Sequence, residues 1–185
     1  MSTAPPGRST AWLAVRAAAA SVYFAAIFFV AIPAWLVAGN VRVVSASTPG
    51  RALGGLAILG GSLLVTWLVV VFVRDGRGTH VPLDPPQHLV ASGLYRWVRN
   101  PMYVLYVLII LGEALLFASG PLVVYAAIFW LVFHAYVVWR EEPLLRRRFG
   151  DSYVAYCRTV PRWLPRPPRT DTAASTRVVN PRDPD

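Results

Sequence analysis

The sequence predicts an all-α protein that crosses a membrane with about four helices. Of its 185 residues, 56% are hydrophobic and only 15% are charged. The charged residues fall outside long uncharged runs such as 21–41 and 52–73. A hydrocarbon layer of about 30 Å needs about 20 apolar residues in a helix, so either run is long enough to cross it.

The first two crossings are expected over residues 12–38 and 52–73. Pro33 stands near the end of the first helix and predicts a kink there. In the second helix, Ala57 and Gly61 have the small-xxx-small spacing that lets two backbones approach closely in lipid. Its glycines lack the order and the strand context of a dinucleotide loop, so the spacing indicates helix packing.

Residues 74–101 form the longest stretch without an apolar run, and they include His80 and His88. Connections of this length in compact proteins usually bind something or are disordered. Aromatic and apolar residues recur within the stretch, from Leu89 to Val98. We therefore expect a segment that lies at the membrane interface.

The last two crossings are predicted as a hairpin. Pro101 suits the first turn of a helix over 101–118, because its missing N–H costs nothing there. Ser119-Gly120-Pro121 makes a tight turn, and the next helix covers 122–139. Residues 1–10 and 166–185 are polar and rich in Pro, and are predicted to be disordered around a single membrane-embedded domain over 11–165.

The formal net charge of +9 comes entirely from Arg, which flanks the apolar runs. This placement follows the positive-inside rule and argues against nucleic-acid binding, which needs a basic groove on a water-soluble surface. With four crossings, the Arg-rich segments share one side, so we expect a multi-pass cell-membrane protein with both termini cytoplasmic. The single Cys157 excludes an internal disulfide, and the Cys and His spacing predicts no metal site.

The hairpin predicts that two distant clusters meet. At about 1.5 Å per residue, Arg99 to Tyr103 and Trp139 to Glu142 return to similar depth at one membrane face. A ligand with both signs of charge and a flat aromatic group would find partners there. Ordinary interface anchoring is the alternative interpretation of the same residues. Glu113 is expected well inside the bilayer, where it either makes a structural hydrogen bond or contacts substrate.

Several motifs in order resemble a known family. They are Gln87-His88-Leu89-Val90-Ala91-Ser92-Gly93-Leu94-Tyr95-Arg96-Trp97-Val98-Arg99-Asn100-Pro101-Met102-Tyr103, then Arg140-Glu141-Glu142, then Phe149-Gly150-Asp151-Ser152-Tyr153-Val154-Ala155-Tyr156. Over about residues 80–165 the chain resembles the isoprenylcysteine carboxyl methyltransferase and phospholipid methyltransferase group. Residues 1–75 add only membrane crossings.

The resemblance implies S-adenosylmethionine as the cofactor, held without a Rossmann domain. The cofactor-binding residues that it implies are Gln87, His88, Leu89, Val90, Tyr95, Asn100, Pro101, Met102, Tyr103 and one of Glu141 or Glu142. A carboxylate suits the ammonium or the ribose hydroxyls of the cofactor, Arg99 its carboxylate, and aromatic rings its adenine and sulfonium.

The resemblance also implies roles in catalysis for Arg99, Asn100 and Arg140. The eukaryotic prenylcysteine enzymes have His in place of Asn100, and Arg in place of Val137. The missing Arg is proposed to meet the substrate carboxylate, a role that Arg140 or His134 could take over. Glu113, His134 and Arg140 are therefore the expected substrate-binding residues.

The leading hypothesis is a membrane methyltransferase whose acceptor is a prenylated-thiol carboxylate or a lipid amine. Its expected partners are a lipophilic substrate and the bilayer, while the oligomeric state, the acceptor and the role of the tail stay open. One alternative is an NADPH-dependent reductase of the sterol reductase type, in which Arg146 to Arg148 would meet the 2′-phosphate. The other is a non-enzymatic membrane protein in which the charges are anchors.

Overall fold

The computed structural model describes residues 10–39, 47–76, 89 and 91–167. The prediction of disorder for residues 1–9 and 168–185 concerns residues outside these ranges. Residues 77–88 and 90, which belong to the long stretch 74–101 without an apolar run, also lie outside them. The described residues form helices and contain no strand, so the predicted all-α class is confirmed.

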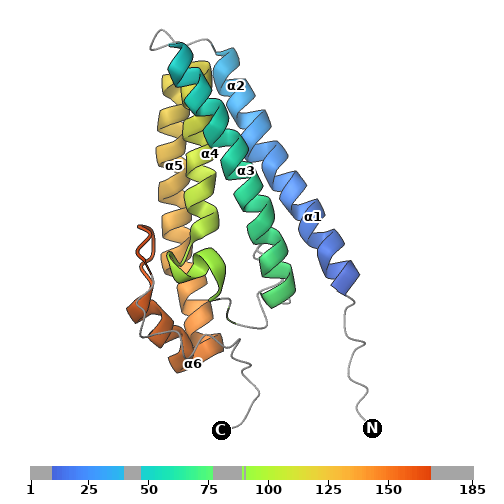
Figure 1. Ribbon diagram of the computed structural model, residues 1–185, viewed down its shortest axis with the longest axis vertical. Coiled ribbons are helices and arrows are strands. Elements are labelled where there is room, and N and C mark those ends of the chain that lie inside the picture. The colour runs from blue at the N-terminus through green and yellow to red at the C-terminus, as the bar shows by residue number, and fades with distance from the viewer. Residues whose placement is uncertain (1–9, 40–46, 77–88, 90, 168–185) are drawn as a thin grey trace.

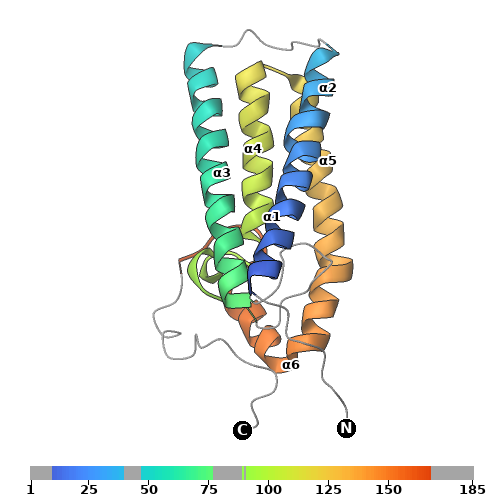
Figure 2. The same cartoon turned by 90° about the vertical axis from the view of Figure 1, so that its right-hand side faces the viewer.

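The described residues form four helical rods, which stand side by side (Figures 1 and 2). The first joins α1 (Thr10–Ala26) to α2 (Ile32–Ala38), and α3 (Thr48–Gly76) is the second. The third is α4 (Pro101–Phe117), and α5 (Gly120–Tyr136) continues into α6 (Glu142–Thr159) as the fourth. Within the part of the chain that the structure describes, three stretches are long and apolar enough to cross a membrane, Ala18–Ala38, Thr48–Val71 and Gly120–Thr159, and α4 is a shorter apolar helix.

A π-helical turn over Ile27–Ala31 lies between α1 and α2, just before Pro33, while the kink predicted at Pro33 stays a prediction. In this turn the N–H of Ile32 bonds to the carbonyl of Ile27, five residues back. With the same five-residue spacing, the next N–H, that of residue 33, would donate to the carbonyl of Phe28. Residue 33 is proline, which has no N–H. The hydroxyl of Tyr125 on α5 donates to that carbonyl instead, at 3.0 Å.

We expect Tyr125→Phe to destabilise the protein by about 1 kcal/mol, because the carbonyl of Phe28 would lose its donor in a region without water. Unfolding in detergent micelles, followed by near-ultraviolet circular dichroism, measures the change. Tyr23 is 71% exposed and serves as the matched control, since Tyr23→Phe removes the same atom without removing a partner. Equal effects of the two substitutions would show that this bond does not hold the first rod.

Close backbone contact holds α3 against α4. A Cβ added to Gly54 would lie 2.5 Å from the carbonyl oxygen of Gly112, and one added to Gly61 would lie 2.7 Å from Cγ1 of Ile109. Ala57 is part of the same face, since its Cβ would lie 3.1 Å from a Cβ added to Gly112. The packing interpretation of the Ala57 and Gly61 spacing is therefore confirmed.

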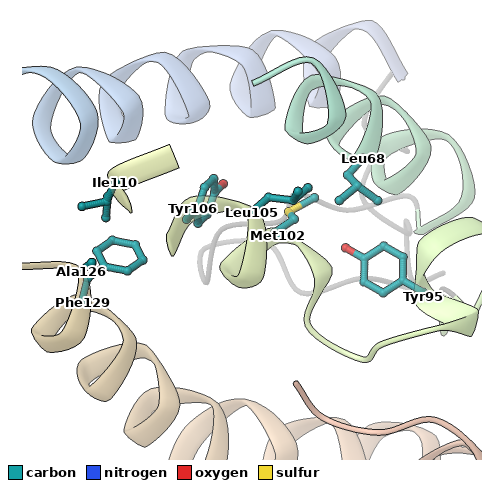
Figure 3. Close-up of a cluster of buried hydrophobic side chains, with 8 residues drawn as sticks. All are labelled: Leu68, Tyr95, Met102, Leu105, Tyr106, Ile110, Ala126 and Phe129. Carbon is teal, nitrogen blue, oxygen red and sulfur yellow. The ribbon is translucent and has the colours of Figure 1, made fainter. Parts of the chain in front are cut away.

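The buried core lies between α3, α4 and α5 and continues down to the loop before α4 (Figure 3). Its residues are Leu68, Tyr95, Met102, Leu105, Tyr106, Ile110, Ala126 and Phe129. The first rod adds aromatic contacts, with the rings of Phe24 and Phe29 each 5.2 Å from the ring of Tyr106. These contacts hold α4 and α5 in register, and the register sets the depth of the residues at their ends.

The last helix is longer than predicted. It does not end near Trp139 but continues through a π-helical turn over Val137–Glu141 into α6, with a non-helical break at Gly150 (φ 51°). Since a crossing needs about 20 residues, the part before Arg140 is enough, and α6 is not needed to cross the bilayer. The start of α1 and the whole of α6 lie at the same end of the bundle (Figure 1).

Candidate functional site

The residues at the start of α4 contact those that follow α5, as the sequence predicts. Ala118 adopts a left-handed conformation (φ 50°) between α4 and α5 and turns the chain back on itself. At the other end, Nη1 of Arg99 lies 2.9 Å from Oε1 of Glu142. The hydroxyl of Tyr103 donates to Oε2 of Glu141 at 3.2 Å. Both glutamates thus contact the start of α4, but each meets a different partner.

Glu142 is the centre of an ion-pair network. Its side chain is 6% exposed, and its oxygens accept from Nε of Arg162 at 2.6 Å and from Nη2 of Arg162 at 3.0 Å, besides Arg99. Burial by itself would raise the pKa of Glu142, but the hydrogen bonds from Arg162 and the charges of both arginines outweigh it and lower the pKa below its usual value. Both carboxylate oxygens are therefore engaged within the protein.

Glu141 differs from its neighbour in sequence. It is half-buried, and Tyr103 is its hydrogen-bond partner among the described residues. Burial raises the pKa of Glu141 to about 7. The hydrogen bond from Tyr103 partly opposes this rise, and the nearby charge of Glu142 adds a smaller upward effect. This carboxylate keeps an oxygen available for a ligand, whereas Glu142 does not.

A C-terminal segment, Val160 to Arg166, returns to the loop before α4. The N–H of Arg99 donates to the carbonyl of Pro161 at 2.9 Å, and the N–H of Arg166 donates to the carbonyl of Trp97 at 3.0 Å. The side-chain amide of Asn100 donates to the carbonyl of Arg162 at 3.2 Å. Sequence reasoning missed Arg162, because only the folded chain shows that α6 turns back towards Glu142.

A row of aromatic rings joins this segment to α5. The ring of Trp163 lies 6.5 Å from that of Tyr103 and 5.7 Å from that of His134. Its indole N–H donates to Nδ1 of His134 at 3.0 Å. The ring of Trp130 stacks on His134 with centroids 5.1 Å apart, and it also lies 6.1 Å from the ring of Trp163. We use the name aromatic row for these four rings together with Glu141, which is hydrogen-bonded to the last of them: Trp130, His134, Trp163, Tyr103 and Glu141.

Not all of the expected site residues meet there. Gln87, His88 and Val90 lie outside the described residues, while Leu89 is half-buried. Tyr95 and Met102 lie in the hydrophobic core, and Pro101 is buried at the first turn of α4. Arg140 is exposed, and the described residues contain no ion pair to it. The roles assigned to these residues stay predictions.

Glu113 lies away from the aromatic row. It is buried, and it stands ten residues after Tyr103 on the same helix, about 15 Å along its axis. It lies one turn before the end of α4. Its Oε2 is buried and has no hydrogen-bond partner among the described residues. Glu113 and His134 are therefore not parts of one cluster.

Comparison with known proteins adds the family. A family model described as phospholipid methyltransferase matches residues 49–152, which is more than half of the chain. The protein-S-isoprenylcysteine O-methyltransferase of Schizosaccharomyces pombe is 33% identical over 78 residues, which cover 42% of this chain and 33% of that protein. The match thus spans about a third of the relative. No solved structure matches the chain. The matched residues include α4, α5 and both glutamates, and the chain belongs to the phospholipid methyltransferase family.

Proposed function

We propose that this membrane protein transfers a methyl group from S-adenosylmethionine to a lipophilic acceptor at the membrane boundary. The observation that carries the proposal is the pair of Tyr103 and Glu141, which the hairpin brings together beside a row of aromatic rings. Membership in a methyltransferase family supports the reaction type. We further propose that this end of the bundle faces the cytoplasm, from which a polar cofactor can enter.

The side chains at this end fit the chemistry of the cofactor. Glu141 can accept from its ammonium group or its ribose hydroxyls, because one carboxylate oxygen is not needed by Tyr103. Nε of Arg99 is buried without a hydrogen-bond partner among the described residues, and it can donate to a carboxylate. The ring of Tyr103 offers a face to adenine or to the positive sulfonium.

The ion-pair network explains how the site is held. When bound, S-adenosylmethionine supplies an electrophilic methyl group whose C–S electron pair stays on sulfur after displacement. The chain must align the acceptor with this methyl group and exclude water, rather than supply strong acid or base catalysis. Glu142 fixes Arg99 and Arg162 and so joins the start of α4 to the C-terminal segment. A carboxylate acceptor becomes a methyl ester without release of a proton, whereas an amine acceptor gives an ammonium group that later loses one.

Loss of the Glu141 charge should weaken cofactor binding. We expect Glu141→Gln to raise the dissociation constant of S-adenosylmethionine about 10-fold to 100-fold, because a charge-assisted hydrogen bond contributes about 1.5–3 kcal/mol. Tyr103→Phe should raise it less, since the carboxylate stays in place but loses its donor. Isothermal titration calorimetry of the protein in detergent measures both. Asp151 is exposed on α6, so Asp151→Asn removes a charge elsewhere and should leave the constant unchanged.

The same titration separates this proposal from a reductase. Binding of NADPH at micromolar concentration, with no heat from S-adenosylmethionine, would overturn the methyltransferase assignment. If neither Glu141→Gln nor Tyr103→Phe changes cofactor binding, the charges are membrane anchors instead. Radiolabelled methyl transfer into a lipid extract, followed by identification of the labelled species, then identifies the acceptor.

A further inference from the structure

The hydrogen bond between Trp163 and His134 determines where the proton of the imidazole lies. An indole N–H can only donate a hydrogen bond. Since the N–H of Trp163 points at Nδ1 of His134 at 3.0 Å, that nitrogen must carry a lone pair and no proton. Neutral imidazole has one N–H, which must then be on Nε2. Trp163 therefore makes His134 a hydrogen-bond donor at Nε2.

The aromatic row leads from the lipid-facing side of α5 towards Glu141. Trp130 is 38% exposed, and Leu131 beside it is 56% exposed, as expected for a helix face in contact with lipid. His134 follows Trp130 by one helical turn, and Trp163 connects it to Tyr103. Tyr103 is in turn bonded to Glu141. A lipophilic molecule that enters from the bilayer along Trp130 would meet His134 before it reaches the proposed methyl donor.

We infer that His134, held by Trp163 with its proton on Nε2, binds an oxygen of the lipophilic methyl acceptor. This inference rests on the proposed function. Trp163 is then a positioning residue, which acts on the acceptor through His134. The observation that carries the inference is the hydrogen bond from the indole N–H of Trp163, which can only donate, to Nδ1 of His134. His134 also stacks on Trp130 and belongs to the same row as the hydrogen-bonded pair Tyr103 and Glu141.

The direction of the N–H limits the chemistry of the bound group. An N–H pairs with a lone pair, so carboxylate and phosphodiester oxygens fit it and an ammonium group does not. The acceptor that His134 recognises therefore has an oxyanion next to an apolar chain. A prenylated cysteine with a free carboxylate and a phosphatidylethanolamine both have one.

The test combines a spectroscopic measurement with kinetics. In protein labelled with ¹⁵N-histidine, the signals of His134 should show a proton on Nε2 alone, and His134→Gln identifies them by their loss. Trp163→Phe keeps a ring but removes the donor, so the two neutral tautomers should mix. It should also raise the KM for the acceptor about threefold to tenfold, the range expected for one hydrogen bond. The kcat and the dissociation constant of S-adenosylmethionine should stay within twofold.

Further variants test the direction of the hydrogen bond. His134→Leu should raise the KM at least as much as Trp163→Phe, and His134→Gln should recover most of the loss because its amide N–H takes the place of Nε2–H. Trp139 lies on the same continuous helix as His134 and is 74% exposed, so Trp139→Phe is the matched control for the loss of an indole N–H. Each variant is assayed with the prenylated cysteine and with phosphatidylethanolamine vesicles, and the acceptor whose KM responds is the one that His134 binds.

Two results would overturn the inference. One is a wild-type His134 signal with its proton on Nδ1, and the other is an unchanged acceptor KM in both Trp163→Phe and His134→Leu. Failure of the proposed function gives a different result, because the wild-type protein would then neither bind S-adenosylmethionine nor methylate either acceptor. The ¹⁵N signals report the tautomer in either case.

Discussion

Glu142→Gln should lower the free energy of unfolding by about 3–5 kcal/mol, the range observed when one partner of a buried ion pair is removed. Glu142 is the shared partner of Arg99, whose side chain is 11% exposed, and of Arg162, whose side chain is 33% exposed. A neutral amide would leave both guanidinium groups without a counter-charge. The contact between the start of α4 and the C-terminal segment would then weaken, and methyl transfer should fall with it.

Arg146→Gln is the matched control for this network. Nη2 of Arg146 lies 4.0 Å from Oε2 of Glu142, and its side chain is 58% exposed, so solvent screens the pair. We expect a change within about 0.5 kcal/mol for this control. Unfolding of each variant in mixed micelles, followed by near-ultraviolet circular dichroism, gives both values. Similar losses for the two variants would mean that burial does not distinguish these ion pairs.

The same network predicts the effect of acid. Because the pKa of Glu142 is lower in the folded protein than its ordinary value of 4.5, the carboxylate stabilises the fold at neutral pH. This stabilisation is present above pH 4.5 and is lost as the pH falls through the folded pKa. Glu142→Gln has no carboxyl group to titrate at this position, so its stability should depend less on pH in that range.

Gly54→Leu should separate α3 from α4 and destabilise the protein by about 3 kcal/mol or more, at the upper end of the cost of overpacking. A Cβ at this position would lie 2.5 Å from the carbonyl oxygen of Gly112 and 2.8 Å from the N of Leu116. Both are backbone atoms, which cannot move aside as a flexible side chain can. Relief therefore requires the two helices to move apart, which would also disturb Leu68 and Leu105 in the core.

Gly55→Leu provides the control one residue away. A Cβ at Gly55 would meet no atom within 4 Å, so the same side chain enters open space on the same helix. Helix propensity changes equally in both variants, so the difference between their unfolding free energies isolates the contact with α4. A Gly54→Leu protein as stable as Gly55→Leu would show that these helices do not need close backbone contact.

Much of the fold could be predicted because lipid imposes strong constraints on length and polarity. The uncharged runs predict the crossings, and the Ser119-Gly120-Pro121 turn predicts the hairpin. The end of the last helix could not be predicted in this way, because hydropathy falls after Trp139 although the helix continues. The π-helical turn and the break at Gly150 leave no signal in the periodicity of the apolar residues.

The sequence by itself determined that Arg99 to Tyr103 and Glu141 to Glu142 lie at one end of a hairpin, because the rise per residue sets depth along two helices that share a turn. Only the tertiary structure decided that Glu142 is held by Arg99 and Arg162 while Glu141 bonds to Tyr103. Adjacent helical residues point in directions about 100° apart, so what each one meets depends on the segments packed around it. Arg162 and Trp163 reach the site only because the chain after Gly150 turns back to the loop before α4.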